Sequence, residues 1–406
     1  MPFSPPPIGS KRMKHTSLAA RYRPQTFADV AGQEMIKAVL SKASAEDRIA
    51  AGYLLCGTRG VGKTTIARIF SKALNCEHAP CAEPCNECGS CRKITQGLHP
   101  DVVEIDGASN NSVEDARALR ENIGYAPMEG RYKIFIIDEA HMLSKNAFNA
   151  LLKTLEEPPK HVTFIFATTE VHRFPATILS RCQVFSFHHL PEEALARHRA
   201  KVLAEESIPF EEGAVRLIAR RGAGSVRDSM SLLDQTLAYG PEKLTADVVR
   251  EILGLAGLDA LRTLFGALAA HDCARTAAFC RELASKEVDI GFFLTELASN
   301  LRSLFLMCEC GRDSLAALGA AQDELDFWAE TAPQFTSGYL HAAWQMVLES
   351  QRGITTSQEP AAALELLLVN LALLPKLLPA LAADKALAQA PGGGAQPRPT
   401  QAPAGQ

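Results

Sequence analysis

Residues 57–64 of this 406-residue chain have the composition and spacing of a loop that wraps phosphate groups. Gly57 and Gly62 are followed by Lys63 and Thr64, and the loop joins an apolar run to a helical pattern. Glycines let backbone amides curl around phosphates, where a helix N-terminus adds positive potential. Lys63 would reach the β- and γ-phosphates, and the Thr64 hydroxyl would ligate Mg²⁺. A chance glycine turn is the alternative, but strand, loop, Lys-Thr pair and helix coincide, so we expect a nucleotide site.

Two acidic residues, Asp138 and Glu139, end the apolar run 134–137. Carboxylates at that place leave the carboxyl end of a buried strand, where open α/β sheets have their ligand crevices. Asp138 suits the Mg²⁺ shell, and Glu139 suits a base that polarises the attacking water. An acidic pair at a strand end is by itself more often a solvated turn, so the catalytic interpretation depends on the loop at 57–64.

Five cysteines lie close together in the chain: Cys76, Cys81, Cys85, Cys88 and Cys91. Such spacing suits a tetrahedral Zn²⁺ site with four thiolates, which has no open position and is therefore structural. Unliganded thiols or an iron–sulfur cluster are the alternatives. Five cysteines compete for four places.

Three further features are weak when taken alone. Thr168 and Thr169 close the apolar run 162–167 and could sense a γ-phosphate, although a polar cap is the simpler interpretation. Arg181 and Arg227 each lie on a probable helix, where an arginine is usually solvated.

The elements that must position these residues alternate in type up to about residue 190. Short apolar runs at 53–56, 102–105, 134–137 and 162–167 are separated by helical patterns. This alternation predicts a parallel sheet with helices on both faces. Beyond residue 190 apolar residues recur at helical spacing, which predicts helical domains with candidate breaks at Gly291, Gly311 and Gly338.

The composition is that of a packed globular chain, with 47% hydrophobic and 22% charged residues. No apolar run approaches a membrane span, and the first residues lack a secretory signal, so we expect a cytoplasmic protein with no membrane contact. In that setting cysteines indicate metal ligation or buried thiols and not disulfides. A net charge of −4 argues against a protein that coats nucleic acid through overall charge, so we expect any DNA contact to be local.

The motifs together resemble a known family. They occur in the order Arg21–Gln33, the loop at 57–64, the cysteine insert, Phe148–Pro159 and Ile178–Cys182. The chain from about residue 18 to 235 resembles the gamma/tau family of bacterial DNA polymerase III, the AAA+ ATPases of the sliding-clamp loader. The cysteine insert discriminates most, because similar branch-migration ATPases lack it.

The resemblance implies an α/β fold: a P-loop AAA+ domain with a parallel sheet and a zinc-binding insert, then a helical lid and an all-α collar. The implied boundaries are a flexible tail at 1–17, the ATPase domain at 18–190 with its insert at 75–93, the lid at 191–256, the collar at 257–382 and a disordered tail at 383–406. The chain stops soon after the third domain, so we expect the short, gamma-like form.

The resemblance also implies the site residues. ATP would be held by Arg23, Pro24, Val30, Gly57, Thr58, Gly60, Val61, Gly62, Lys63, Thr64 and Thr65. The catalytic set would be Lys63, Asp138, Glu139, the sensor Thr169 (with Thr168 as second choice), Arg181 and Arg227. Arg181 would act in trans on a neighbouring subunit's ATP, and Arg227 would reach the phosphates from the lid. Mg²⁺ would be ligated by Thr64 and Asp138, and Zn²⁺ by Cys76, Cys85, Cys88 and Cys91, leaving Cys81 spare.

The implied partners are the delta and delta prime subunits, further copies of this chain, the beta sliding clamp and primer–template DNA. Lys153 is implied to lie near a DNA-facing surface, whereas Ser112 replaces a basic residue of some relatives, so we expect no charged DNA contact there. The activity would be ATP hydrolysis, with no polymerase active site in this chain.

Parts of the sequence also suggest two other functions. Asp-Glu-Ala-His at 138–141 suggests a helicase, but no second RecA-like half follows residue 190. A zinc-dependent scaffold with a dead nucleotide site is the other, and the intact Lys63, Asp138 and Glu139 argue against it.

Overall fold

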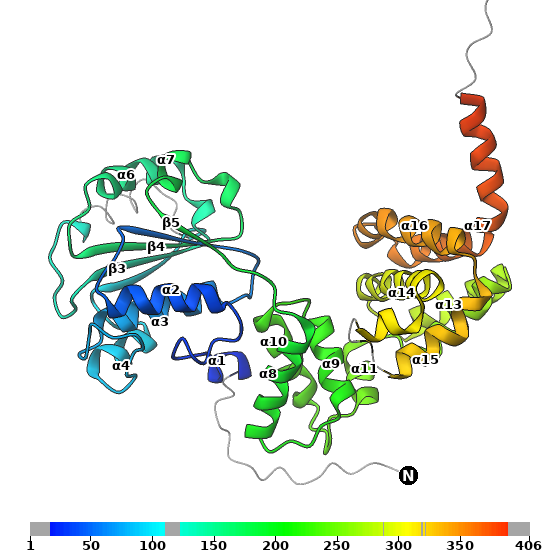
Figure 1. The fold of residues 1–406 in the computed structure, drawn as a ribbon, viewed down its shortest axis with the longest axis horizontal. Coiled ribbons are helices and arrows are strands. Elements are labelled where there is room, and N and C mark those ends of the chain that lie inside the picture. The colour runs from blue at the N-terminus through cyan, green and yellow to red at the C-terminus, as the bar shows by residue number, and fades with distance from the viewer. Residues whose placement is uncertain (1–16, 110–121, 287, 318–319, 321, 389–406) are drawn as a thin grey trace, which may run out of the picture. The chain divides into compact units, whose positions relative to one another are not determined.

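The computed structural model describes residues 17–109, 122–286, 288–317, 320 and 322–388 (Figure 1). The chain divides into two compact units, Met1–Val249 and Arg250–Gln406. Ser112 and nearly all of the predicted N-terminal tail lie outside the described residues. None of the described helices is both long enough and apolar enough to cross a bilayer.

The first unit contains a five-stranded sheet in which every paired strand is parallel. Its strands are β1 (Gly52–Cys56), β2 (Val102–Asp106), β3 (Lys133–Asp138), β4 (Val162–Thr168) and β5 (Gln183–Ser186). Their order across the sheet is β2-β3-β4-β1-β5. The predicted parallel sheet is therefore confirmed, and the ends of β1, β3 and β4 lie next to one another.

Two apolar layers cover the sheet because alternate side chains of each strand point to opposite faces. Along β3, Ile134 and Ile136 join one buried cluster, whereas Phe135 and Ile137 join the other. Helices α2 (Glu34–Ala45) and α3 (Lys63–Asn75) pack on the first face. On the opposite face lie α6 (Lys145–Glu156) and α7 (Ala176–Leu179), as Figure 1 shows.

One strand escaped prediction. β5 pairs only with β1, at the edge of the sheet, and most of its residues are exposed. Its sequence Gln-Val-Phe-Ser has no apolar run, because an edge strand with an open face need not be apolar throughout.

The other described helices of the first unit lie before the first strand, in the cysteine insert, between strands and in a bundle that follows the sheet. They are α1 (Leu18–Arg21), α4 (Gly89–Gln96), η1 (Ala140–Met142), η2 (Val171–Arg173), α8 (Glu192–Glu205), α9 (Glu212–Arg221) and α10 (Val226–Ala238). Helix α11 (Ala246–Leu253) spans the boundary between the two units. In the bundle α8, α9 and α10 pack on one another, with Leu195, Ile218 and Leu233 fully buried.

The second unit consists of helices throughout its described residues. They are α12 (Leu258–Ala269), α13 (Cys273–Ser285), α14 (Ile290–Ala317), α15 (Gln322–Thr331), η3 (Ala332–Gln334), α16 (Ser337–Thr355) and α17 (Pro360–Ala388). Gly311 breaks α14 with a φ of 77°. Gly291 and Gly338 instead lie in the first turns of α14 and α16.

The predicted disordered tail at 383–406 is corrected at its start, because α17 continues through Ala388. The stretch up to that residue is rich in Ala, Leu and Lys, which are strong helix formers, and the Pro-Gly sequence comes only afterwards. Residues 389–406 lie outside the described part of the chain. The contact boundary at Val249–Arg250 falls within the lid range expected from sequence, so the three-part division remains a prediction.

Candidate nucleotide site and metal centre

The loop between β1 and α3 has the backbone that its glycines permit. Gly57, Gly60 and Gly62 have φ values of 148°, 80° and 102°, in the region that side chains disfavour. A Cβ on Gly57 would lie 2.6 Å from the carbonyl oxygen of Phe187, and one on Gly60 would lie 2.0 Å from Ser225 Oγ. The loop is thus held between the segment that follows β5 and the bundle of α8, α9 and α10, which we call the lid bundle.

Lys63 begins α3 and is buried, with 6% of its surface exposed. Its Nζ donates to the carbonyl oxygens of Gly57 and Thr58, each at 2.8 Å. Burial lowers the pKa of Lys63, and the nearby carboxylates of Glu139 and Asp138 oppose that shift. The ammonium group therefore lies inside the curl of the loop, where a phosphate group would be its natural counter-ion.

Thr64 and Asp138 are in contact at the carboxyl ends of the strands. Thr64 Oγ1 donates to Asp138 Oδ2 at 2.9 Å, and Asp138 Oδ1 accepts from the backbone N–H of Glu139 at 3.0 Å. Asp138 is the last residue of β3, so its carboxylate is fixed at the carboxyl end of the strand. A hydroxyl and a carboxylate oxygen are ligands of the hard kind that Mg²⁺ prefers.

Glu139 has a left-handed backbone, with a φ of 44°. Its carboxylate accepts a 3.5 Å hydrogen bond from Thr169 Oγ1 and lies 3.5 Å from His141 Nδ1. His141 Nδ1 is also 3.1 Å from the Thr168 hydroxyl, which is fully buried. The structure therefore brings both predicted sensor threonines near the Glu139 carboxylate, Thr169 directly and Thr168 through His141.

Lys63, Thr64, Asp138 and Glu139 line a cleft of about 730 Å³ in the first unit, whereas His141, Thr168 and Thr169 are not among its lining residues. Most of the predicted nucleotide-binding residues line it: Arg23, Pro24, Val30, Gly60, Val61, Gly62, Lys63, Thr64 and Thr65, together with Asp138, Glu139 and Arg227. Gly57 and Thr58 are joined to the site through their carbonyl contacts with Lys63. The chain positions far apart in sequence therefore meet around one cavity of the size that holds a nucleotide.

The lid bundle supplies Arg227 to this cleft. The backbone N–H groups of Val226 and Arg227 donate to the Gly60 carbonyl at 3.1 and 3.3 Å, and Ser225 caps α10. Among the described residues the guanidinium groups of Arg59 and Arg227 have no ion-pair or hydrogen-bond partner. Burial lowers the pKa of Arg23, and the charges of Arg68 and Arg227 lower it further. The cleft wall thus carries two arginines without a salt-bridge partner in the described part of the chain, as a polyanion site requires, while Asp106, Asp138 and Glu139 line the same cleft.

Arg181 does not join this cleft. Its guanidinium pairs with Glu156 Oε1 at 2.8 Å and donates to the Thr177 carbonyl at 2.7 Å. A third of its side chain is exposed. The arginine therefore lies outside its own chain's site, which is the placement that a role in trans needs. Lys153 lies on α6, and its side chain is outside what the structure describes.

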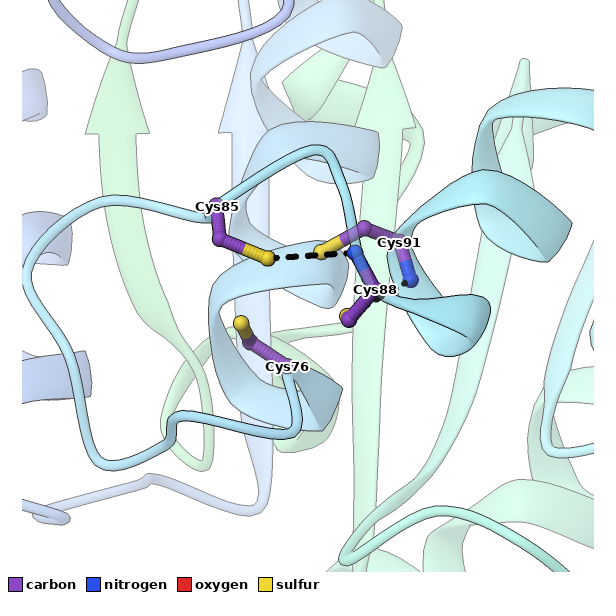
Figure 2. Close-up of side chains that lie close together, drawn as sticks. All are labelled: Cys76, Cys85, Cys88 and Cys91. Carbon is purple, nitrogen blue, oxygen red and sulfur yellow. Dashed lines mark hydrogen bonds between the residues drawn. The ribbon is translucent and has the colours of Figure 1, made fainter.

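Four of the five insert cysteines converge. One sulfur from each of Cys76, Cys85, Cys88 and Cys91 lies within 4.8 Å of the others, and Figure 2 shows the side chains pointing toward one another. Tetrahedral zinc at a Zn–S distance of about 2.3 Å needs sulfurs about 3.8 Å apart, so the set fits with small adjustments. Cys81 is outside the set, and its sulfur contacts the Ala73 carbonyl at 3.5 Å.

Backbone N–H groups favour the thiolate form of Cys85, whereas burial raises the pKa of Cys91. The N–H of Cys88 donates to Cys85 Sγ, and the N–H of Cys91 donates to Cys88 Sγ, each at 3.4 Å. Burial raises the pKa of Cys85, but hydrogen bonds from the backbone N–H groups of Cys88 and Glu87 lower it by more. The resulting pKa is about 6. Cys76 directly follows α3 and Cys91 lies in α4, so the cluster ties the insert to the helix that begins at Lys63.

Comparison with known proteins gives three family models that match consecutive parts of the chain. The model for the DNA polymerase III delta subunit matches residues 32–191. The model for the ATPase lid domain of the DNA polymerase III clamp loader subunit matches residues 194–242. The model for domain III of subunits gamma and tau matches residues 244–387.

Individual relatives decide the family. The DNA polymerase III subunit gamma of Buchnera aphidicola subsp. Baizongia pistaciae is 37% identical over 295 residues, which cover 73% of this chain and 80% of that relative. The chain belongs to the gamma/tau family of DNA polymerase III subunits.

Other gamma/tau relatives are more similar but longer. Subunit tau/gamma of Haemophilus influenzae is 50% identical over 243 residues, covering 60% of this chain and 35% of the relative. Subunit tau of Escherichia coli is 44% identical over 307 residues, covering 76% and 47%. The chain spans between 35% and 55% of the length of four such longer relatives. Among solved structures, a Thermotoga maritima RuvB branch migration motor aligns with a TM-score of 0.45 and 20% identity, over 66% of this chain and 86% of that one.

In this gamma/tau chain the cleft also contains residues that sequence reasoning missed. Asp106 ends β2 beside Asp138 in the sheet register, and its position at a strand end was a usable signal. His198 and Met230 come from the lid bundle, where helical periodicity gives no sign of a ligand-facing side chain. Burial lowers the pKa of His198 to about 4, with help from the charge of Arg199, so the imidazole is neutral in the cleft.

Proposed function

We propose that this chain is the ATPase subunit of a bacterial sliding-clamp loader and uses ATP binding and hydrolysis to load the clamp on primed DNA. Its membership of the gamma/tau family supports this proposal. The observation that carries it is the arrangement of Lys63, Thr64 and Asp138 at one end of a cleft that also receives Arg227.

The roles follow from chemistry at that end of the cleft. Lys63 and the amides of the loop would bind the β- and γ-phosphates, while Thr64 and Asp138 would hold Mg²⁺. Bound Mg²⁺ neutralises phosphate charge and orients the transferred group. Glu139 would accept a proton from the attacking water, and Thr169, which contacts its carboxylate, would position that water and sense the γ-phosphate.

The nucleoside would occupy the less polar part of the cleft. Arg23, Pro24 and Val30 line the cleft on the segment that follows α1, so they would cover the adenine. Arg227 would add positive charge at the phosphates from the lid. Phosphate binding by the loop would then change the position of the lid, because Gly60 of the loop contacts the N-terminus of α10 directly.

Zinc in the cysteine cluster would be structural. Four thiolates fill a tetrahedral site and leave no position for substrate or water. Cys76, Cys85, Cys88 and Cys91 would hold the ion, with Cys81 as the spare thiol.

Assembly would complete the active site. Arg181 would stabilise transition-state charge on ATP bound by a neighbouring copy, and the helical second unit would serve as the collar that joins subunits. The partners would be the delta and delta prime subunits, other copies of this chain, the beta clamp and primer–template DNA, all in the cytoplasm. The proposed chemistry is ATP hydrolysis, and polymerisation would belong to other subunits of the holoenzyme.

The test is an ATPase assay on the purified chain alone and in a reconstituted loader. We expect slow hydrolysis by the chain alone and a large stimulation when loader subunits, clamp and primed DNA are all present. Hydrolysis that ignores both clamp and DNA would contradict the clamp-loading role. Failure of the chain to bind ATP at all would contradict the nucleotide site itself.

A further inference from the structure

Lys72 is a buried cation that joins three parts of the first unit. It lies on α3, with 1% of its surface exposed. Its Nζ donates to the Gln25 carbonyl at 2.8 Å, to Gln25 Oε1 at 2.7 Å and to Asn86 Oδ1 at 2.6 Å. Gln25 belongs to the segment after α1, and Asn86 lies between two cysteines of the metal cluster. All three donors of the ammonium group are therefore used between these two segments.

Glu83 forms a second connection between the same two segments. Its carboxylate accepts the backbone N–H of Phe27 at 2.8 Å and that of Ala28 at 3.1 Å. Glu83 is an exposed residue of the cysteine insert, and its two acceptor bonds fix the backbone of the segment at Phe27 and Ala28. Ionised acceptors make the stronger kind of hydrogen bond to backbone amides.

The connected segment is part of the nucleotide cleft. Arg23, Pro24 and Val30, which flank Gln25 and Phe27, line the cavity. The segment 22–30 has no helix or strand to fix it, apart from turns. Its position over the cleft therefore depends on side-chain contacts, and those of Lys72 and Glu83 both lead to the cysteine insert.

We propose that the metal-binding insert is a brace for the nucleotide site, in which Lys72 and Glu83 are positioning residues that hold segment 22–30 over the cleft. This inference rests on the proposed function, since it concerns the same nucleotide site. It assigns the insert a task in the ATPase domain: an ordered insert favours nucleotide binding. By linkage, bound nucleotide then stabilises the insert by an equal factor.

The burial of Lys72 supports the connection. Among the described residues, Lys72 has no carboxylate within ion-pair distance, so its buried ammonium group is satisfied by the three oxygen acceptors of Gln25 and Asn86. Losing these acceptors would leave a buried cation without partners, which holds the two segments against α3.

The experiment measures equilibrium binding of a fluorescent ATP analogue to the purified full chain, together with metal content and hydrogen exchange of residues 22–30. The variants are Lys72→Met and Glu83→Ala. Their matched controls are Lys93→Met and Glu87→Ala, exposed residues of the same insert, of which Lys93 pairs with Glu129 at 2.6 Å. We expect both test variants to weaken binding at least roughly fivefold and to speed exchange in 22–30, while the controls match the native chain.

A thermodynamic cycle that combines metal removal with Lys72→Met tests whether the insert acts on the nucleotide site through Lys72. Removing the metal by chelation should weaken binding in the native chain but add little in Lys72→Met, because the connection is already broken. Equal weakening by chelation in both chains would overturn the brace, as would native affinity in Glu83→Ala. If Lys72→Met loses its metal or fails to fold, Glu83→Ala decides alone, since Glu83 is an exposed residue.

Failure of the brace and failure of the nucleotide site give different results. If the native chain binds the analogue and Lys63→Ala does not, the nucleotide site stands whatever Lys72→Met and Glu83→Ala show. If Lys63→Ala binds as tightly as the native chain, the cleft is not the nucleotide site, and the brace fails with it.

Discussion

Thr64 Oγ1 and Asp138 Oδ2 share a 2.9 Å hydrogen bond that joins the first turn of α3 to the end of β3. The contact places a hydroxyl from the phosphate-binding loop beside the strand end that carries Glu139. Asp138 also accepts the Glu139 N–H, so one carboxylate contacts both the Thr64 hydroxyl and the backbone of Glu139. In the proposed mechanism, we expect a change at Thr64 or Asp138 to alter phosphate binding and water activation together.

Replacing Lys63 with Ala should remove the charge inside the curl of the loop. Hydrogen bonds to charged groups contribute about 1.5–3 kcal/mol, so nucleotide affinity should fall roughly 10- to 100-fold. Lys42→Ala, at an exposed position of α2, is the control. Equilibrium binding of ATP measures both, and native affinity in Lys63→Ala would remove the basis of the proposed nucleotide site.

Replacing Glu139 with Gln should separate binding from turnover. The amide keeps the size of the side chain but accepts no proton, so hydrolysis by the assembled loader should fall by about 10²–10⁴. Nucleotide affinity should stay close to that of the native chain, because the phosphate contacts of Lys63 are untouched. Parallel loss of affinity and hydrolysis would show that Glu139 serves the structure and not the water.

The nucleotide loop and the acidic strand end were predictable because local sequence determines them. Glycine spacing sets the turn, and a buried strand carries Asp138 to the sheet edge where α3 begins. The choice among five cysteines was not decided by spacing. Resemblance indicated the four, and the structure brings their sulfurs together because Cys76 directly follows α3 while α4 begins after Cys88.

Contacts between segments that are distant in sequence could not be predicted from the local sequence pattern. Lys72 has the sequence context of a solvated helix lysine, yet it is buried because Gln25 and Asn86 close over it. His198 likewise looks like a polar residue on an amphipathic helix. Its place in the cleft depends on how the lid bundle packs beside Gly60, which no periodicity encodes.

Metal analysis tests the cysteine assignment. The purified chain should contain about one zinc ion, because four thiolates close a structural site. Cys81→Ser should retain the metal, whereas Cys88→Ser should lose it and lower the stability of the first unit. Metal retention in Cys88→Ser with loss in Cys81→Ser would mean that the ligand set includes Cys81. Protein prepared under reducing conditions without any metal would refute the zinc site.

His198 should make stability depend on pH. Its folded pKa is lowered from 6.5 to about 4, so both states are neutral above pH 6.5 and the full stability is present there. As pH falls from 6.5 toward 4, His198 is protonated in the unfolded chain but stays neutral in the folded chain. The free energy of unfolding therefore decreases. Urea unfolding of His198→Gln at about pH 7 and about pH 5 should therefore show a smaller loss than the native chain.

The exposed His172 provides the control for that measurement. His172→Gln should keep the pH dependence of the native chain. If His198→Gln and the native chain lose the same stability between the two pH values, the imidazole is not held neutral by the fold.

Arg181 tests whether the active site is shared between subunits. Arg181→Ala should leave ATP binding by its own chain nearly unchanged, since the guanidinium lies outside the cleft and pairs with Glu156. Hydrolysis stimulated by clamp and DNA should fall steeply, because an arginine supplied in trans contributes about 10³–10⁵ in rate. Arg216→Ala is the matched control, a half-buried arginine like Arg181 that pairs with Glu212 at the same distance of 2.8 Å.

A mixing experiment then separates action in trans from action in cis. Lys63→Ala damages the site of the subunit that carries it, whereas Arg181→Ala damages the site of its neighbour. Loaders assembled from both variants contain some interfaces where an intact Lys63 meets an intact Arg181, so part of the activity should return. Co-assembly without any recovery, or loss of nucleotide binding in Arg181→Ala alone, would show that this arginine acts within its own chain.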